Sequence, residues 1–96
     1  MKLLMVICPE GRRDQVAAMM EKHEVHSFTE LPQAFGEGVT GKRFGTHVWP
    51  GKSVLVFTVV ADEKKDELVA ALKECQKDLF PDEGMKAFVL PAEEAL

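Results

Sequence analysis

The sequence predicts an α+β domain whose strands and helices follow one another in the order β-α-β-β-α-β. Three observations predict it. Three short apolar runs and one weaker segment with β-branched and aromatic residues have the length and composition of strands. Two intervening segments repeat their apolar residues at the three- and four-residue spacing of an amphipathic helix. A glycine-rich segment separates two halves of similar architecture, and we expect residues 1–96 to form a single domain.

The first half is expected to contain a buried strand, a helix and a weaker strand. Residues 2–8 are almost wholly apolar and stop at Pro9, which is typical of a buried strand. The apolar residues that follow share one helical face, which predicts a helix over residues 12–23. Residues 25–31 read as a weaker strand, and Pro32 marks it as interrupted or near a sheet edge, because proline cannot donate to the ladder.

The second half repeats this order. Residues 53–61 are the most strongly predicted strand, and Asp62 is expected to cap the next helix through its carboxylate. That helix is expected over residues 63–79. Its apolar stripe consists of Leu68, Leu72, Cys75 and Leu79. A turn at residues 81–84 leads to a last strand at residues 85–90 and then to an acidic tail.

This order is the ferredoxin-like arrangement, in which two helices cover one face of an antiparallel sheet. A sheet face in contact with water alternates polar with apolar residues. Residues 3–7, 54–57 and 88–90 are instead apolar at successive positions. Leaving the second face in contact with water would expose a larger apolar patch than monomers usually tolerate. We therefore expect a compact homo-oligomer in which copies of the chain cover the second face.

Composition and charge argue against several classes of protein. The net charge of −4 does not suit nucleic acid as a partner, because phosphate binding needs a basic surface. No apolar run approaches the length of about 18 residues that a membrane span needs. Two cysteines without a secretory signal suggest free thiols, so the cytoplasm is the expected location. No GxSxG, HExxH or P-loop pattern occurs, and we do not expect an enzyme.

The segment of residues 34–51 is unusually rich in glycine. It contains Gly36, Gly38, Gly41, Gly45 and Gly51. Such a segment is expected to be a long functional loop, at about residues 36–51, although an extended hairpin with a glycine-rich tip is the alternative. Lys42 and Arg43 are candidates to clamp an anion, because glycine N–H groups form anion nests and a guanidinium adds a bidentate fork. Simple solubility at a loop tip is the other reading of these two charges.

Histidines and cysteines raise the possibility of a divalent metal site. No CxxC motif occurs, and His23 and His26 flank a helix-to-strand turn instead of sharing one helix face. Cys75 belongs to a buried stripe and Cys8 ends a buried strand, so structural roles are favoured for both. His47 lies in the glycine-rich segment, where packing does not require it, and is the main metal candidate.

Two segments resemble the P-II nitrogen-regulatory signal proteins. MKAFVLPAEEAL, at residues 85–96, resembles their last strand and tail, and FTELPQAFGEGVTGKRFGTH, at residues 28–47, resembles their second strand and long effector loop, the T-loop. The resemblance implies a homotrimer packed sheet to sheet, with clefts between subunits that bind a small effector such as an adenine nucleotide. It also implies a target protein, such as a transporter or an enzyme, controlled through the loop. The related CutA-type trimers give the alternative of a metal-binding protein involved in metal tolerance.

In this family, backbone at the loop base and a glycine-rich turn before the last strand hold nucleotide phosphates. The resemblance, together with the two basic loop residues, indicates a ligand site at Gly36, Glu37, Gly38, Lys42, Arg43, Gly84 and Lys86. Glu83 and Met85 replace the paired glycines of the turn, which would place a carboxylate and a bulky side chain near the phosphates. We therefore expect weak nucleotide binding, or a preference for a smaller or less charged ligand. Uridylylation on a loop tyrosine is excluded, because the chain has no tyrosine.

Overall fold

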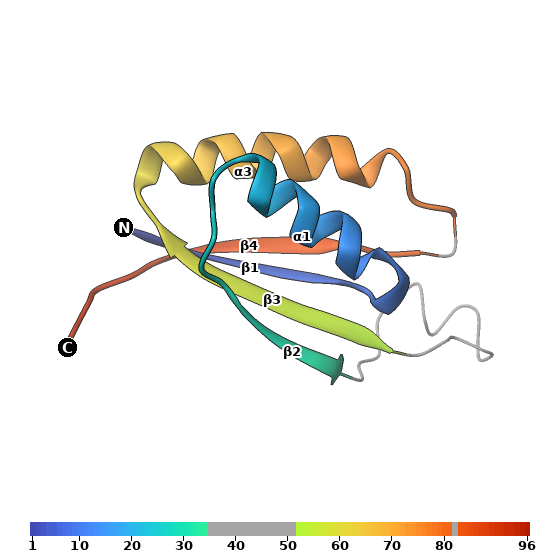
Figure 1. The fold of residues 1–96 in the computed structure, drawn as a ribbon, viewed down its shortest axis with the longest axis horizontal. Coiled ribbons are helices and arrows are strands. Elements are labelled where there is room, and N and C mark those ends of the chain that lie inside the picture. Colours follow the sequence, from blue (N-terminus) through green and yellow to red (C-terminus); the bar gives the residue numbers. More distant parts are fainter. Residues whose placement is uncertain (35–51, 82) are drawn as a thin grey trace.

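The computed structural model describes residues 1–34, 52–81 and 83–96, and the expected loop lies outside these ranges. Figure 1 shows the fold. The described elements are β1 (Lys2–Pro9), the 3₁₀ turn η1 (Glu10–Arg12), α1 (Arg13–Lys22), β2 (Thr29–Ala34), β3 (Ser53–Val60), α3 (Asp62–Gln76) and β4 (Lys86–Pro91). The predicted order of strands and helices is confirmed.

The strands form one antiparallel sheet in the order β2-β3-β1-β4. β1 lies in the middle and pairs with β3 on one side and β4 on the other. Both helices lie over the same face of this sheet (Figure 1). This is the ferredoxin-like fold that the sequence predicted.

The hydrophobic core fills the space between the helices and that face. Leu4 and Val6 of β1 and Val54 and Val56 of β3 are fully buried there. The helices contribute Val16, Met19, Met20, Leu68, Leu72 and Cys75 to the same cluster. The predicted burial of Leu68, Leu72 and Cys75 is confirmed, whereas Leu79 lies beyond the end of α3 and is partly buried. Each large apolar side chain buried in this way contributes about 1.5–3 kcal/mol to folding.

The opposite face of the sheet carries a second set of apolar side chains. Strand pairing places Leu3, Met5 and Ile7 of β1, Leu55, Phe57 and Val59 of β3, and Phe88 and Leu90 of β4 on this face. We call these eight residues the open face. In the single chain, Val59 is 49% exposed and Phe88 is 51% exposed. The prediction that the strands are apolar on both sides is confirmed.

The second strand starts later than predicted. Residues 25–28 are irregular, and β2 begins at Thr29. Glu24 has a φ of 65°, which ends the α1 turn, and the N–H of Val25 then donates to the carbonyl of Met20 at 2.8 Å. Val25 is buried through this helix-end contact and takes no part in the sheet. β2 is an edge strand with a register irregularity between Leu31 and Ala34, as the proline between them predicted.

The predicted cap of the second helix is wrong. Ala61 precedes the first helical residue and makes no side-chain cap, and Asp62 is itself the first residue of α3. The carboxylate of Asp62 lies 3.2 Å from the amino group of Met1, and this contact lowers the pKa of Asp62. A charged partner brought by the fold thus replaces the local backbone cap. The helix ends at Gln76, three residues before the predicted end.

Candidate functional site

Connecting segments converge at one end of the sheet. Pro9, the last residue of β1, pairs with Ser53 at the start of β3, and Ala34 at the end of β2 reaches the same Ser53. The described residues on either side of the glycine-rich segment, Ala34 and Lys52, therefore both lie at this end. The N–H of Glu10 donates to the carbonyl of Lys52 at 3.1 Å. This hydrogen bond connects the turn after β1 to the residue that directly precedes β3.

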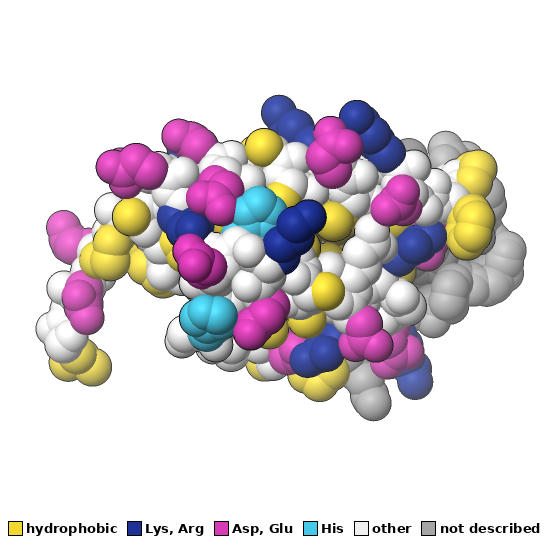
Figure 2. Space-filling model, turned by 45° about the horizontal axis from the view of Figure 1, so that its top comes forward, with side chains coloured by type: hydrophobic (Ala, Val, Ile, Leu, Met, Phe, Trp, Pro, Cys, Tyr) yellow, Lys and Arg dark blue, Asp and Glu magenta, His cyan; other side chains and the backbone are white. Residues whose placement is uncertain are grey.

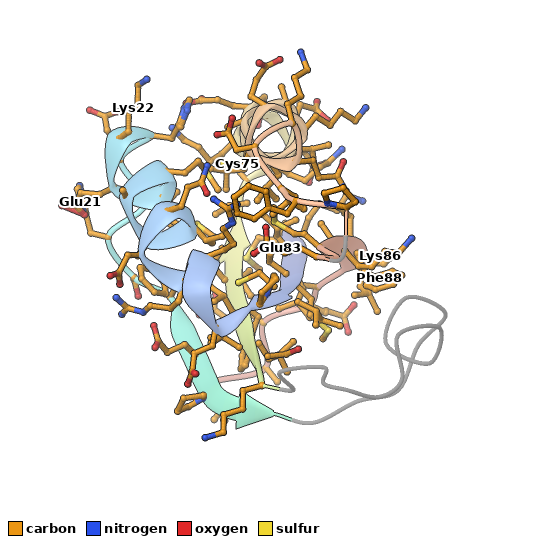
Figure 3. The ribbon with its side chains drawn as sticks, turned by 90° about the vertical axis from the view of Figure 1, so that its right-hand side faces the viewer. Glu21, Lys22, Cys75, Glu83, Lys86 and Phe88 are labelled. Atoms are coloured by element: carbon orange, nitrogen blue, oxygen red, sulfur yellow. The ribbon has the colours of Figure 1, made fainter. Side chains whose placement is uncertain are left out.

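The start of β4 lies at the same end. Lys86, its first residue, pairs with Ile7 near the end of β1. The side chain of Lys86 belongs to the sheet side opposite the helices and is exposed. Figure 3 views the molecule from this end and shows Lys86 and Phe88 directed away from both helices. The predicted ligand residue Lys86 therefore lies at the same end of the sheet as Ala34 and Lys52, the described residues that flank the glycine-rich segment.

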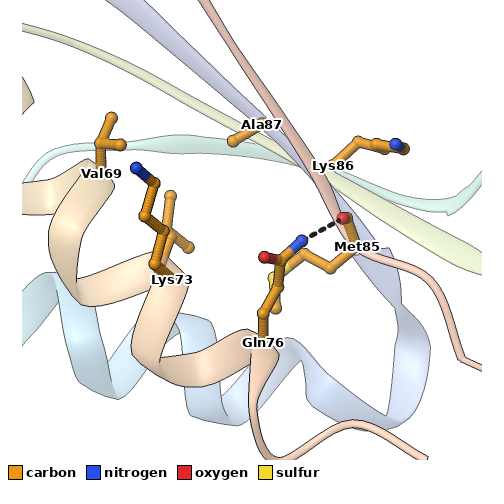
Figure 4. A pocket seen from close by; sticks show the side chains of 7 residues that line it. Val69, Lys73, Gln76, Met85, Lys86 and Ala87 are labelled. Atoms are coloured by element: carbon orange, nitrogen blue, oxygen red, sulfur yellow. Dashed lines mark hydrogen bonds between the residues drawn. The ribbon is translucent and has the colours of Figure 1, made fainter. Parts of the chain in front are cut away.

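A hollow of about 210 Å³ lies between α3 and the start of β4. Lys73 and Gln76 of α3 and Lys86 of β4 are among the residues that line it. Gln76 Nε2 donates to the carbonyl of Met85 at 3.0 Å and fixes the start of β4 against the helix (Figure 4). Pockets for ligands of nucleotide size usually measure about 300–1,000 Å³. The hollow therefore provides only part of the surface that such a ligand needs.

The turn before β4 leaves room beside its glycine. Gly84 is exposed, and apart from its two chain neighbours no heavy atom of the described chain lies within 4 Å of the Cβ that a side chain here would add. Met85 is 5% exposed and belongs to the hydrophobic core. Met85 also contributes to the lining of the hollow between α3 and β4, so the expectation of a bulky side chain near a phosphate stays a prediction.

Glu83 is bound to Arg12 at the start of the first helix. Arg12 donates from Nη2 to Glu83 Oε1 at 2.8 Å and from Nε to the two carboxylate oxygens at 3.1 and 3.3 Å. The N–H of Phe80 donates to the same carboxylate at 2.8 Å. These hydrogen bonds, above all those from Arg12, lower the pKa of Glu83. The carboxylate is present as predicted, but a guanidinium neutralises it.

Arg12 has further partners that hold it in place. Its Nη2 donates to the carbonyl of Asp78 at 2.8 Å, and its guanidinium carbon lies 5.3 Å from the centre of the Phe80 ring. One side chain thus links the beginning of α1 to the chain that follows α3. Reasoning from the sequence missed Arg12, since its partner Glu83 is 71 residues away and no local pattern connects them.

Most of the predicted site residues belong to the glycine-rich segment. Gly36, Glu37, Gly38, Lys42, Arg43 and the metal candidate His47 lie outside the described residues. Of the predicted ligand residues, Gly84 and Lys86 are described, and both belong to the convergent end of the sheet. Arg12 and Glu83 join them there.

The remaining candidate metal ligands lie apart. His26 contacts Glu21 at 2.9 Å and precedes β2, so it lies at the sheet end opposite Ala34 and Ser53. His23 pairs with Glu67. Histidines lie among mixed acidic and basic side chains on the helix side (Figure 2). Burial raises the pKa of Cys8 to about 11, which keeps its thiol protonated. Over residues 1–34, 52–81 and 83–96, no three potential metal ligands come together.

The comparisons with known proteins identify the family. The family model described as nitrogen regulatory protein P-II matches residues 1–96. The chain belongs to the P-II family. The search of curated proteins returned no match. None of the helices in the described ranges is long and apolar enough to cross a membrane.

Solved structures share the fold of this P-II family chain. A PII-like signalling protein from Thermus thermophilus, described as putative, is 23% identical with a TM-score of 0.63, over 92% of this chain and 82% of that one. The PII-like protein CPII from Thiomonas intermedia, bound to ADP, AMP and bicarbonate, is 14% identical with a TM-score of 0.70, over 93% and 88%. CPII bound to ADP, AMP and acetate is 12% identical with a TM-score of 0.67, over 97% and 88%.

Proposed function

We propose that this P-II family protein is a cytoplasmic regulator, not an enzyme, that binds a small anionic effector between the subunits of a homotrimer. The observation that carries the proposal is that the described residues flanking the glycine-rich segment, the turn after β1 and the start of β4 converge at one end of the sheet. Effector binding at this end would be communicated to a target protein through residues 36–51. Ordering of a segment by a ligand is an established way to switch a protein.

The open face supports the assembly. Its apolar side chains would be buried by packing sheet against sheet, with a gain of about 25 cal/mol for each Å² removed from water. Closed symmetry would allow three copies to cover one another completely. The small hollow beside Lys86 also supports an intersubunit site, because a second subunit would supply the surface that one chain lacks.

Charge and space at the start of β4 support an anionic effector. Lys86 offers an exposed ammonium, and the open space at Gly84 allows a ligand to approach the backbone closely. The CPII structures were described with ADP, AMP and bicarbonate. For this chain we propose ADP, AMP or a small anion such as bicarbonate, in preference to a triphosphate. Gly36, Glu37 and Gly38 would contribute at the loop base, and Lys42 and Arg43 would close over the ligand.

Calorimetric titration of the assembled protein with ADP, AMP, ATP and bicarbonate tests the proposal. Lys86→Ala should weaken the bound anion by about 1.5–3 kcal/mol, because a charge-assisted hydrogen bond is lost. Lys77→Ala is the matched control, since Lys77 is an exposed lysine paired with Glu74. Absence of binding to all four ligands would overturn the proposed effector site. Equal affinity of Lys86→Ala and Lys77→Ala would show that the site lies elsewhere.

A further inference from the structure

The contact between Arg12 and Glu83 has the geometry of a bidentate pair in partly buried surroundings. Both side chains are only 20% exposed. The Glu83 carboxylate also accepts the N–H of Phe80, and Arg12 also donates to the carbonyl of Asp78. Both partners are therefore held by further groups. Loss of the Arg12 contact would leave the Glu83 carboxylate without its guanidinium partner.

The position of the pair relates it to the proposed effector site. Glu83 directly precedes Gly84 and stands three residues before Lys86. Figure 3 shows Glu83 directed toward α1, whereas Lys86 is directed away from it. The two charges of this turn are thus separated, with the acidic one facing a guanidinium. A carboxylate released from Arg12 would be free to approach Lys86 and to repel an anion bound there.

We propose that Arg12 is a positioning and specificity-determining residue of the effector site, which acts by holding Glu83 away from the anion. This inference rests on the proposed function of that site. Arg12 does not contact the ligand in this mechanism. Its role is to compensate the carboxylate that stands beside Gly84, so that the turn accepts an anionic group.

The mechanism predicts that substitutions of Arg12 and of Glu83 affect anion affinity differently, although the two residues form one ion pair. Removing the guanidinium leaves a free carboxylate near the site and weakens anion binding. Removing the carboxylate charge leaves a free guanidinium in the same place and does not weaken it. If the pair only held the turn in shape, loss of either partner would weaken binding alike. The sign of the Glu83 effect therefore separates an electrostatic role from a structural one.

The chain offers a matched control. Arg13, the next residue, donates to Glu30 of β2 from Nη2 at 2.8 Å and from Nε at 3.0 and 3.1 Å. This pair has nearly the same geometry as that of Arg12, but it ties α1 to the edge strand and does not involve the turn before β4. Arg13→Gln removes an equal charge from the same helix start.

The experiment is titration of ADP into the assembled wild-type protein and four variants, each checked for folding by circular dichroism. Arg12→Gln should weaken ADP binding at least about tenfold, equivalent to about 1.4 kcal/mol. Arg13→Gln should change it less than about threefold, about 0.6 kcal/mol on the same scale. Glu83→Gln should bind at least as tightly as the wild type. The Arg12→Gln/Glu83→Gln double variant should recover the affinity lost in Arg12→Gln.

Each other outcome overturns the inference. Equal ADP affinity of Arg12→Gln and Arg13→Gln would overturn the role of Arg12 but would leave the proposed function intact. Loss of affinity in Glu83→Gln would show that the pair serves only the shape of the turn. If Arg12→Gln fails to fold, the double variant decides, because weak binding without the carboxylate contradicts the mechanism. A wild-type protein that binds none of ADP, AMP, ATP and bicarbonate overturns the proposed function, and this inference with it.

Discussion

Phe57→Asp should dissociate the proposed homotrimer. Phe57 lies on the open face in the middle of the sheet, between Met5 of β1 and Thr29 of β2 in the strand register. Its neighbour Val56 is 1% exposed and faces the helices. The two residues therefore provide a sharp comparison, because the same substitution at adjacent positions acts on opposite faces of one sheet.

The expected effect is large. Removing a buried aromatic side chain forfeits about 1.5–3 kcal/mol per subunit. Placing an unpaired polar group in the apolar interface adds at least about 1–3 kcal/mol, and an ionised carboxylate adds more. The sum of several kcal/mol per subunit lowers the association constant by about a thousandfold or more. The monomer itself should stay folded, because Phe57 is not part of the helix-side core.

Light scattering coupled to size exclusion measures the outcome at micromolar concentration. The wild type should show roughly 32 kDa, three times the chain mass of 10.7 kDa, and Phe57→Asp should show the chain mass. Val56→Asp should instead lose its native circular dichroism. Leu96→Asp is the control, since this apolar side chain is fully exposed in the tail. A wild-type monomer, or a Phe57→Asp variant of unchanged mass, would refute the reasoning from the open face.

Two further predictions concern the turn before β4 and the core thiol. Gly84→Val should leave the free energy of unfolding nearly unchanged but weaken ADP binding in calorimetry, because its side chain occupies the open space beside the turn; unchanged affinity would contradict a ligand there. The pKa of Cys8 is raised from 9.0 to about 11 in the folded state, so the folded protein retains a proton that the unfolded chain loses. The free energy of unfolding should therefore fall as pH rises from about 9 to 11, by about 2–3 kcal/mol at most. Chemical denaturation across this range should show a shallower fall in Cys8→Ala, and identical pH profiles would contradict the assignment.

The fold could be predicted from the sequence because its signals are local and periodic. The stripe containing Leu68 and Leu72 repeats at helical spacing, and both residues are buried as that spacing requires. The apolar run in β3 lacks strand alternation, and the structure places Leu55 and Val56 on opposite faces. Both the helical spacing and the apolar run can be recognised from neighbouring residues in the sequence alone. The prediction of an apolar second sheet face followed from them directly.

The helix cap and the second strand could not be predicted because distant or competing partners decide them. Asp62 has the side chain of a good N-cap, but the amino group of Met1 lies close enough to bind it. Val25 has high strand propensity, yet its N–H completes the end of α1 through Met20. In both cases the local preference was real, and a contact formed by tertiary structure outweighed it.

The chemistry of the turn before β4 depends on the same kind of distant contact. Taken alone, Glu83 and Met85 place a negative charge and a large side chain where the family pattern has glycine. Folding buries Met85 in the core and pairs Glu83 with Arg12. The turn thus keeps open space at Gly84, and the charge of the neighbouring Glu83 is compensated by Arg12. Both properties arise although Glu83 and Met85 stand at the two positions where the family pattern has glycine. Whether a carboxylate repels a ligand depends on its partner as much as on its own position, and here that partner belongs to the opposite half of the chain.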